Sequence, residues 1–355
     1  MANRIFELPE TRGRFQCKGI VNGTEKEKFY TEKKTSTGSD FRAVNFGCEF
    51  DKQKSMYLNL TGMPRQNVYF SKRDTKTKKT ETKAVPWGNR YTFSEEGFNL
   101  IGTRLGITKT TDEEGKLVND KKVMPEFDAC EYIANNLNDD ASVFIKGKID
   151  FSSYIDSNGD VRRSTKYVPE QISLCKEVNF DEYDYIENKP VNDFMQTIVF
   201  NGIEKETADG KETGRFIVSA YIVTYSDVVA TEFIIVDAKL ASLFKKNLKP
   251  YYSIDVHGHV EVTHVVEEVD EDDGWGESNA MNRVSAPSKI EMVITGAKPS
   301  SIDKETYTEE NVSNAIKAVR NSKTAEKNFN SGNSNQSEND WGEDNDDEDD
   351  ELPWD

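Results

Sequence analysis

The chain has 355 residues, of which 35% are hydrophobic and 31% charged, and its formal net charge is −18. This length suits two ordinary domains with an appendage, and the lean apolar content argues against one large enzyme core. Eleven acids and no Lys or Arg lie between residues 334 and 355. The remainder of the chain is therefore closer to neutral, and local basic patches can dominate its surface.

The four cysteines, Cys17, Cys48, Cys130 and Cys175, are scattered among apolar neighbours. None belongs to a Cys-x-x-Cys pair, so neither a zinc ribbon nor a thioredoxin-like site is indicated, and reduced thiols in a cytosolic protein are expected. Residues 1–10 lack the apolar core of a signal peptide, and no apolar run is long enough to span a membrane. We expect no membrane partner.

An internal repeat organises the chain. The pattern Asn-Gly-x-Glu-Lys-Glu occurs at residues 22–27 and again at 201–206, an offset of 179. A glycine in the middle of an alternating strand recurs as Gly147 and Gly258, an offset of 111. Chance similarity between short segments is the alternative, but two matches in the same order favour duplication. Because the two offsets differ, the first copy must contain extra residues between its strands.

Alternation and helical spacing predict the elements in chain order. In the first copy we predict strands at 14–22, 40–50, 55–61, 142–152 and 166–175, and helices at 94–105 and 125–137. In the second copy we predict strands at 193–201, 214–225, 229–236, 251–264 and 287–296, and a helix at 238–248. Three strands, a helix and two strands is the order of the oligonucleotide-binding (OB) barrel. We therefore expect a mainly β protein with two five-stranded Greek-key OB-fold barrels in tandem, each with an inserted helix.

These elements predict the domain boundaries. The predicted parts are a first OB-fold domain at 1–178 with a basic insertion at 63–91, a linker at 179–192, a second OB-fold domain at 193–303, a short helical segment at 304–322 and an acidic tail at 323–355. Thr308 followed by Glu309 and Glu310 is typical of a helix start. After residue 322 almost no apolar side chains occur, so we predict a disordered tail that cannot offset its ordering entropy.

Sequence-tolerant binding of single strands needs cations for the phosphates and aromatic faces for unstacked bases. The stretch from Arg65 to Arg90 has a net charge of +6 and contains aromatic residues. We interpret it as a basic β-hairpin or flap over the barrel groove, and the alternative is a Lys/Thr loop that serves solubility. The candidate DNA-binding residues here are Arg65, Tyr69, Phe70, Lys72, Arg73, Lys78, Lys79, Trp87, Arg90 and Tyr91.

Further candidates lie on the predicted barrels. They are Arg42, Phe46 and Tyr57 on early strands, Tyr154, Arg162, Arg163, Lys166 and Tyr167 around the turn at 157–160, and Arg215 and Tyr221 in the second copy. Strand alternation must place some of these aromatics in the core. The equivalent loop of the second copy, 265–286, is acidic, so we expect the first barrel to bind more strongly and with little sequence specificity.

Residues 340–355 combine a dense anionic run with an apolar tip. This tail resembles that of bacterial and phage single-stranded DNA-binding proteins, which closes with a pattern of the Asp-Asp-Ile-Pro-Phe kind. The matching residues are Asp349, Asp350, Glu351, Leu352, Pro353 and Trp354, although here Asp355 follows the aromatic residue. The two-barrel body with an insertion resembles replication proteins of tailed bacteriophages.

The resemblance implies that the protein coats exposed single-stranded DNA during phage replication and recombination, in the cytoplasm of the infected bacterial cell. It also implies that the apolar tip binds replication or recombination proteins. A tail that serves solubility alone is the alternative, but it explains the acids and not the apolar tip.

An enzyme is the first alternative function. His257 and His259 alternate on one predicted strand, but no Cys or paired carboxylate completes a metal site, and surface histidines are the commoner outcome. No phosphate-binding loop, nucleophile elbow or His-Glu-x-x-His motif occurs. We therefore expect no enzyme activity, no metal and no cofactor. An adaptor or virion-associated protein that uses the barrels for protein contacts is the alternative function. Two barrels on one chain are compatible with a monomer.

Overall fold

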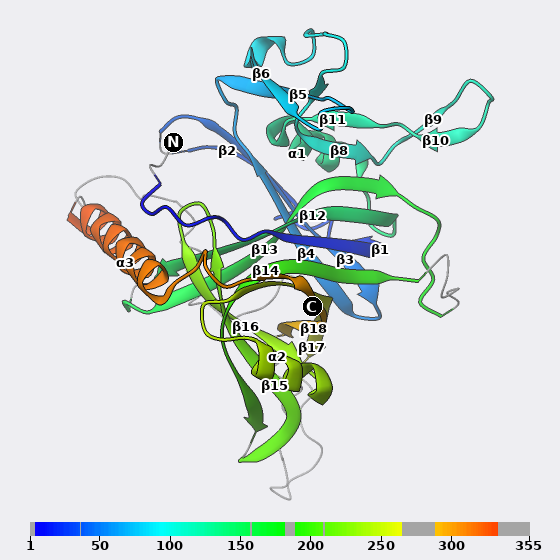
Figure 1. Ribbon diagram of the computed structural model, residues 1–355. Coiled ribbons are helices and arrows are strands. Elements are labelled where there is room, and N and C mark those ends of the chain that lie inside the picture. The colour runs from blue at the N-terminus through cyan, green and yellow to red at the C-terminus, as the bar shows by residue number, and fades with distance from the viewer. Residues whose placement is uncertain are drawn as a thin grey trace, which may run out of the picture.

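The computed structural model describes residues 4–35, 37–156, 158–181, 189–208, 210–264 and 288–332. The predicted acidic tip, the loop at 265–286 and residues 182–188 of the predicted linker lie outside the described residues. The described chain is mainly β, as predicted, and its three α-helices are α1 (Glu126–Asn136), α2 (Ala238–Asn247) and α3 (Glu309–Gly332) (Figure 1).

The first barrel is closed by five strands. They are β1 (Gly13–Asn22), β3 (Asp40–Asp51), β4 (Lys54–Gly62), β12 (Ser142–Ile155) and β13 (Val161–Leu174). β1 pairs with both β3 and β12, β3 pairs with β4, and β12 pairs with β13, all antiparallel. A parallel contact between β13 and β4 closes the ring, and α1 precedes the fourth strand. This is the predicted OB-fold order.

The second barrel repeats this connectivity. Its strands are β14 (Val191–Ala208), β15 (Lys211–Val223), β16 (Val228–Ile235), β17 (Ser253–His264) and β18 (Ser288–Asp303). β14 pairs with β15 and β17, β15 with β16, and β17 with β18, while β16 meets β18 in parallel. α2 again precedes the fourth strand, and the Asp237 side chain caps it by accepting from the Lys239 amide.

The repeated glycines allow the strands to approach one another closely. A Cβ atom on Gly147 would lie 2.0 Å from the carbonyl oxygen of Val168, and one on Gly258 would lie 1.8 Å from that of Val293. The strand register shifts next to each glycine, as in a β-bulge. No side chain fits at these two positions, which explains why both copies keep glycine there.

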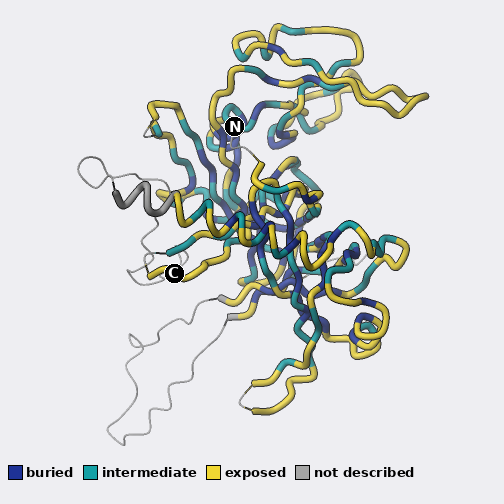
Figure 2. The backbone as a smooth tube through the Cα atoms, turned by 60° about the vertical axis from the view of Figure 1, so that its left-hand side comes forward, coloured by how far each residue is buried: buried dark blue, intermediate teal, exposed yellow. Residues whose placement is uncertain are grey.

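The two barrels share one sheet. β1 pairs antiparallel with β14, and Phe15 lies opposite Phe194, which is its equivalent at the repeat offset of 179. A local two-fold axis therefore relates the barrels through this pair, and the whole forms one 13-stranded sheet. Buried side chains of both barrels make one continuous core. Figure 2 shows the buried stretches of the backbone running through both barrels. The cysteines are free thiols, of which Cys175 alone is not fully buried.

The extra residues of the first copy lie between β4 and α1. They form β5 (Asn67–Arg73), β6 (Thr80–Pro86), the short helix η1 (Trp87–Asn89), β7 (Asn99–Leu100), β8 (Thr103–Gly106), β9 (Lys109–Thr111), β10 (Leu117–Asn119) and β11 (Lys122–Met124). We call residues 65–100 the basic module. Its strands β6, β5 and β7 form a separate sheet around a small core of Val68, Phe70 and Val85.

The predicted helix at 94–105 is wrong. β7 pairs with β5, and β8 joins the large sheet beside β13. The apolar residues Phe98 and Leu100 pack on the small core of the basic module, whereas Leu105 is buried in the main core. Three glycines between residues 97 and 106 disfavour a helix here, and Gly97 adopts a positive φ of 79°. The edge strand β2 (Tyr30–Lys34), which pairs with β3, was not predicted.

Helix α3 starts where predicted, because the Thr308 hydroxyl accepts from the Asn311 amide. It continues to Gly332, so the predicted end at residue 322 is wrong. Lys323 holds this later part of the helix by donating to Asp227 at 2.6 Å and to the Ser153 hydroxyl at 2.7 Å. Helix α3 thereby contacts both barrels. None of the helices in the described ranges has the length and apolar character needed to cross a membrane.

Candidate nucleic-acid interface

The β5–β6 hairpin carries the densest group of exposed cations. The two strands pair from Asn67 opposite Pro86 to Arg73 opposite Thr80, which confirms the hairpin interpretation. The side chains that are exposed and form no ion pair with another described residue are Arg65, Arg73, Lys76, Lys78 and Lys79. Tyr69 is 40% exposed on the same hairpin. This surface therefore offers cations and one ring to a ligand.

Two further lysines of the module already make contacts within the protein. Lys72 donates to the Glu96 carbonyl at 3.0 Å, and Lys83 pairs with Glu95. Both ammonium groups lie over the Phe98 ring, at 5.8 Å and 4.3 Å from its centroid. These contacts fold the 90–100 segment back over the hairpin.

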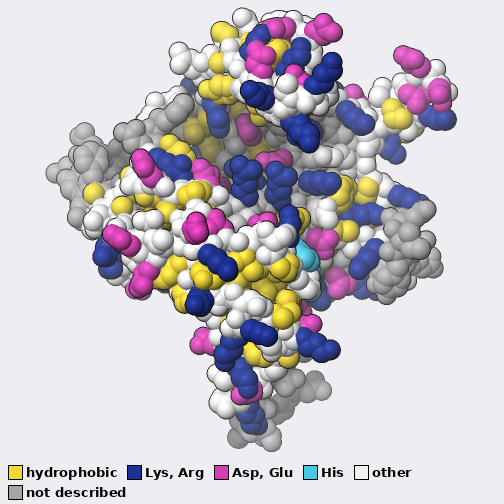
Figure 3. All heavy atoms as spheres, in the orientation of Figure 1, with side chains coloured by type: hydrophobic (Ala, Val, Ile, Leu, Met, Phe, Trp, Pro, Cys, Tyr) yellow, Lys and Arg dark blue, Asp and Glu magenta, His cyan; other side chains and the backbone are white. Residues whose placement is uncertain are grey.

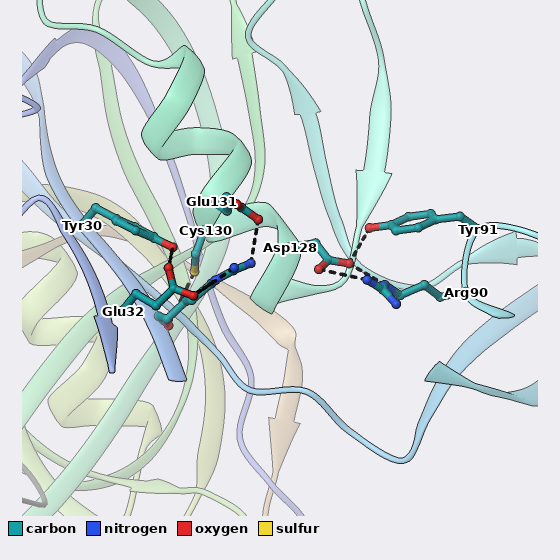
Figure 4. Close-up of polar contacts among 8 residues, drawn as sticks. Tyr30, Glu32, Arg90, Tyr91, Asp128, Cys130 and Glu131 are labelled. Carbon is teal, nitrogen blue, oxygen red and sulfur yellow. Dashed lines mark hydrogen bonds and ion pairs between the residues drawn. The ribbon is translucent and has the colours of Figure 1, made fainter. Parts of the chain in front are cut away.

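Three predicted DNA contacts instead attach the module to the barrel. Arg90 donates to Asp128 of α1 at 2.6 Å and 3.4 Å, and the Tyr91 hydroxyl donates to the same carboxylate at 2.6 Å (Figure 4). The Arg90 guanidinium also lies 4.5 Å from the centroid of the Trp87 ring, which meets Phe127 edge-on. Burial and the bond to Asp128 raise the pKa of Tyr91. All three residues therefore hold the module on α1, while the Tyr91 side chain remains 55% exposed.

Arg42 is held from the other side of α1. Its guanidinium pairs with Glu32 at 3.0 Å and with Glu131 at 2.7 Å, and it lies 4.1 Å from the centroid of the Phe127 ring. The Tyr30 hydroxyl donates to Glu32 (Figure 4). Hydrogen bonds from Tyr30 and Arg42 lower the pKa of Glu32, while burial and the bond to Glu32 raise that of Tyr30 to about 12. The two carboxylates neutralise the charge of Arg42 locally, so this site does not attract a phosphate.

Three predicted aromatic contacts are wrong because their rings are buried. Phe46 is 1% exposed, Tyr167 4% and Phe70 5%. Phe46 and Tyr167 belong to the barrel core, and Phe70 packs against Phe93 with ring centroids 4.6 Å apart. Desolvation raises the pKa of Tyr167 well above its ordinary value. Tyr57 is only half-buried on β4, and burial raises its pKa to about 12.

The long β12–β13 hairpin carries the remaining first-barrel candidates. Tyr154 is 54% exposed and lies opposite Arg162, which pairs with Asp156 at 2.8 Å. Arg163 and Lys166 are exposed and form no ion pair with any residue in the described ranges. The hairpin therefore provides an exposed ring beside two unneutralised cations.

Sequence reasoning missed the cations on the outer face of β12 and β1. Lys146 and Lys148 flank Gly147 and are exposed, whereas Ile145 and Ile149 point into the core. Lys148 lies opposite Arg14 of β1. These three cations form no ion pair within the described part of the chain. The alternation along β12 could have located them, because it places every second side chain on the outer face of the barrel.

The cations of β12 face those of the module. In Figure 3, Lys and Arg side chains gather over β12 and along the adjacent rim of the module, with a hollow between the two groups. The β12–β13 hairpin continues β12 toward α3, where Ser153 contacts Lys323, and it extends this basic surface along the first barrel. We refer to it as the cationic surface.

The second barrel lacks such a surface at its predicted residues. Arg215 pairs with Glu291 at 2.5 Å and with Glu206 at 3.4 Å. Glu291 has a side chain only 7% exposed. Burial would raise its pKa, but Lys289 and Arg215 hold that pKa below its ordinary value.

Tyr221 is likewise engaged within the protein. Its ring stacks on Tyr251, with centroids 6.3 Å apart and planes 7° from parallel. It packs against a cluster of buried apolar residues. Among the described residues, no group of three or more His, Cys, Asp or Glu is placed to hold a metal.

Comparison with known proteins gives distant structural likenesses. A deletion mutant of the single-stranded DNA binding protein from Thermus aquaticus has 9% identity and a TM-score of 0.38, with 85% of this chain and 98% of that chain covered. The wild-type protein has 10% identity and a TM-score of 0.36, with 81% and 91% covered. These likenesses are too remote to assign a function. No curated protein matches the sequence. The family described as YorF matches residues 72–332, more than half of the chain, and this protein belongs to that family.

Proposed function

We propose that this protein binds single-stranded DNA without sequence specificity along the cationic surface. The observation that carries the proposal is that exposed cations without carboxylate partners lie on three elements of the first barrel and its module. Folded proteins usually neutralise clustered cations with nearby acids, as this chain does at Arg42, Arg90 and Arg215. Cations left unpaired in a group suit a polyanionic ligand.

Exposed rings supply the second requirement. Tyr69 on the module and Tyr154 on the β12–β13 hairpin are 40% and 54% exposed. A base stacked on such a ring contributes about 1–3 kcal/mol, and every base has a face that can stack. Strand β12 has 14 residues, so it spans about 45 Å at about 3.3 Å per residue. The surface is therefore long enough to contact several successive nucleotides.

The proposed contact residues revise the sequence prediction. From the predicted set we retain Arg65, Tyr69, Lys72, Arg73, Lys78, Lys79, Tyr154, Arg163 and Lys166, and we add Arg14, Lys146 and Lys148; Arg162 is left out because it pairs with Asp156. The contacts expected from these side chains are with phosphates and base faces, which are common to all sequences. Duplex DNA hides its base faces, so we expect it to bind more weakly.

The test is titration of fluorescent oligonucleotides over a series of salt concentrations. Arg73→Glu, Lys78→Glu and Lys79→Glu together should weaken single-strand binding about tenfold or more and flatten its salt dependence. The matched control reverses three exposed lysines near α2, Lys245→Glu, Lys246→Glu and Lys249→Glu, which changes the net charge equally. Equal losses in both variants would show that net charge, not this surface, sets affinity. No binding by the unaltered protein would favour the adaptor function.

We also propose, from the sequence pattern, that residues 349–354 bind replication or recombination proteins of an infected bacterial cell. An immobilised peptide of residues 340–355 should retain host replication proteins, and Trp354→Ala in the peptide should abolish retention. The same acids would compete with DNA for the cationic surface, so a chain ending at Gly332 should bind oligonucleotides more tightly at low salt. Unchanged affinity would argue against that competition.

A further inference from the structure

The outer faces of the two barrels meet where β1 pairs with β14. β12 pairs with β1, β1 with β14, and β14 with β17, all antiparallel, so four neighbouring strands lead from one barrel to the other. Directly opposite residues of paired strands point to the same face of a sheet. One row of such residues, all exposed, consists of Lys148, Arg14, Met195 and His257. We call these four residues the seam row.

The seam row continues the cationic surface onto the second barrel. Its first two members, Lys148 and Arg14, are part of that surface. Neighbouring strands lie about 4.8 Å apart, so the row is about 14 Å long from Lys148 to His257. In Figure 3 a histidine side chain lies on the same face as the Lys and Arg side chains over β12, and all histidines of this chain lie on β17. A polynucleotide held at Arg14 is therefore within a few nucleotides of the second barrel.

Met195 is the apolar member of the seam row, and it is 62% exposed. Its neighbours along β14, Phe194 and Gln196, are only 1% and 2% exposed. Single exposed apolar side chains are common, but this one lies between a cation and an imidazole on the opposing strands. The unbranched thioether of methionine adapts to irregular surfaces and makes favourable contacts with aromatic rings. Met195 therefore offers a contact for a base beside groups that attract its phosphate.

His257 is the last member of the seam row, and its ring lies over Gly296 of β18. A Cβ atom on Gly296 would come within 2.4 Å of the His257 Nε2, so glycine leaves room for the ring. The residue opposite on β14 is Met195, so neither neighbouring strand places a carboxylate directly across from the imidazole. Imidazole is the side chain that gains a positive charge as pH falls from about 8 to about 5.

The acids around His257 already have partners within the protein. The titratable and charged side chains next to it along β17 and diagonal to it on β14 and β18 are Asp255, His259, Asp193 and Lys298. Asp255 accepts from the Thr197 hydroxyl at 2.7 Å. Asp193 accepts from the Gln16 amide at 3.2 Å. The protonated ring of His257 is therefore available to a phosphate.

We infer that the bound strand crosses from the first barrel to the second along the seam row, with a base on Met195 and a phosphate at His257. This inference rests on the proposed function, because it extends the path of the same strand. It gives the second barrel a contact that strengthens as pH falls, when the imidazole gains its charge. The first barrel, whose contacts are Lys and Arg, has no such dependence in this range.

The first experiment measures the affinity of the full chain for oligo-dT by fluorescence anisotropy at constant salt. Met195→Glu places an anion in the seam row and should weaken binding about fivefold, whereas Met195→Lys should strengthen it about twofold. Leu243→Glu and Leu243→Lys are the matched controls, because Leu243 is an apolar side chain of α2 that is 55% exposed. Neither control should change the affinity. Thermal unfolding shows whether each variant retains the fold.

The second experiment repeats the titration at about pH 7.5 and about pH 5.5. Thymine has no group that titrates in this range, so a change in affinity reports on the protein. The unaltered chain should bind about threefold more tightly at the lower pH, and His257→Gln should lose most of that gain. His257→Lys is charged at both pH values, so it should bind tightly at both and also lose the gain.

The outcomes separate this inference from the proposed function. If the unaltered protein binds no oligomer, both fail. If it binds, but both folded Met195 variants match their Leu243 controls, the strand does not cross the seam row and the inference is overturned, while the cationic surface still stands. A pH-dependent gain that is equal in the unaltered protein and in His257→Gln would overturn the phosphate contact at His257.

Discussion

The two barrels share one strand arrangement but differ in the side chains on their outer faces. The offsets of the repeat make Lys146 and Lys148 equivalent to His257 and His259, and they make Arg14 equivalent to Asp193. Each barrel keeps a glycine at the strand crossing and pairs its first strand with that of the other. The two copies therefore match at these inward positions, whereas the outward positions are cationic in only one of them.

Separate residues therefore determine the barrel fold and the binding surface. The second barrel neutralises Arg215 with Glu291 and Glu206, whereas the first leaves Lys146 and Lys148 unpaired among the described residues. The first barrel also carries the basic module, which has no counterpart in the second copy. Variants at equivalent positions can therefore separate stability from binding.

The largest expected effect is on the stability of the fold that the two barrels share. Gly147→Ala and Gly258→Ala each place a Cβ within 2.0 Å of a carbonyl oxygen, so each should lower the free energy of unfolding by about 3 kcal/mol. Denaturant unfolding measures this loss. Gly202→Ala is the control, because a Cβ there meets nothing within 4 Å. A large loss in only one of the two barrels would contradict the shared frame.

The next effect is on binding. Lys146→Glu with Lys148→Glu should reduce affinity for single-stranded DNA about tenfold and lower the slope of log K against log salt by about 1.4, as for two lost phosphate contacts. His257→Glu with His259→Glu changes the equivalent positions of the second barrel and should have a smaller effect. Fluorescence anisotropy over a salt series measures both. Equal losses of affinity in the two variants would contradict the claim that the first barrel binds more strongly than the second.

A smaller effect is expected at the joint between module and barrel. Arg90→Met removes a partly exposed ion pair with Asp128 and should destabilise docking of the module by about 1 kcal/mol after solvent screening. Hydrogen exchange of the amides at 67–100 should speed up, while exchange in β14–β18 stays the same. Lys116→Met, which removes an exposed pair with Glu114, is the control. Faster exchange throughout the chain would show that Arg90 stabilises the whole fold.

The smallest effect is a loss of stability at alkaline pH. Burial raises the pKa of Tyr30 and Tyr57 on the first barrel from about 10 to about 12. A raised folded-state pKa stabilises the fold below the unfolded pKa, and this contribution disappears as pH rises from about 10 through about 12. Tyr57→Phe should therefore reduce the decline in stability across that window. An unchanged pH dependence would indicate that Tyr57 ionises without penalty.

The barrel frame could be predicted because its signals are local and repeated. Alternation located β1, β3 and β12, and the recurrence of Gly147 at Gly258 indicated two copies of one fold. The helix predicted at 94–105 failed because its apolar residues pack on two different sheets. Helical spacing within one segment carries no information about such separate partners.

The binding surface was less predictable because its electrostatics depend on distant partners. Arg42 is neutralised by Glu131, which lies 89 residues away, and Arg90 by Asp128, 38 residues away. The sequence gives no sign of these distant partners, so it predicts both arginines to be available to DNA. Phe46 was misassigned because alternation separates two strand faces without indicating which face points into a closed barrel. The same alternation could have located Lys146 and Lys148. Apolar residues at every second position of β12 point inward, which places these two lysines on the outer face.

Photo-cross-linking of the full chain to an oligonucleotide, followed by mass spectrometry of the linked peptides, tests the central claim most directly. Our account predicts that the strongest cross-links fall in residues 65–79 and 146–166, with weaker ones at residues 10–14. Cross-links concentrated on β15, β16 or α2, with the module and β12 unlabelled, would contradict it.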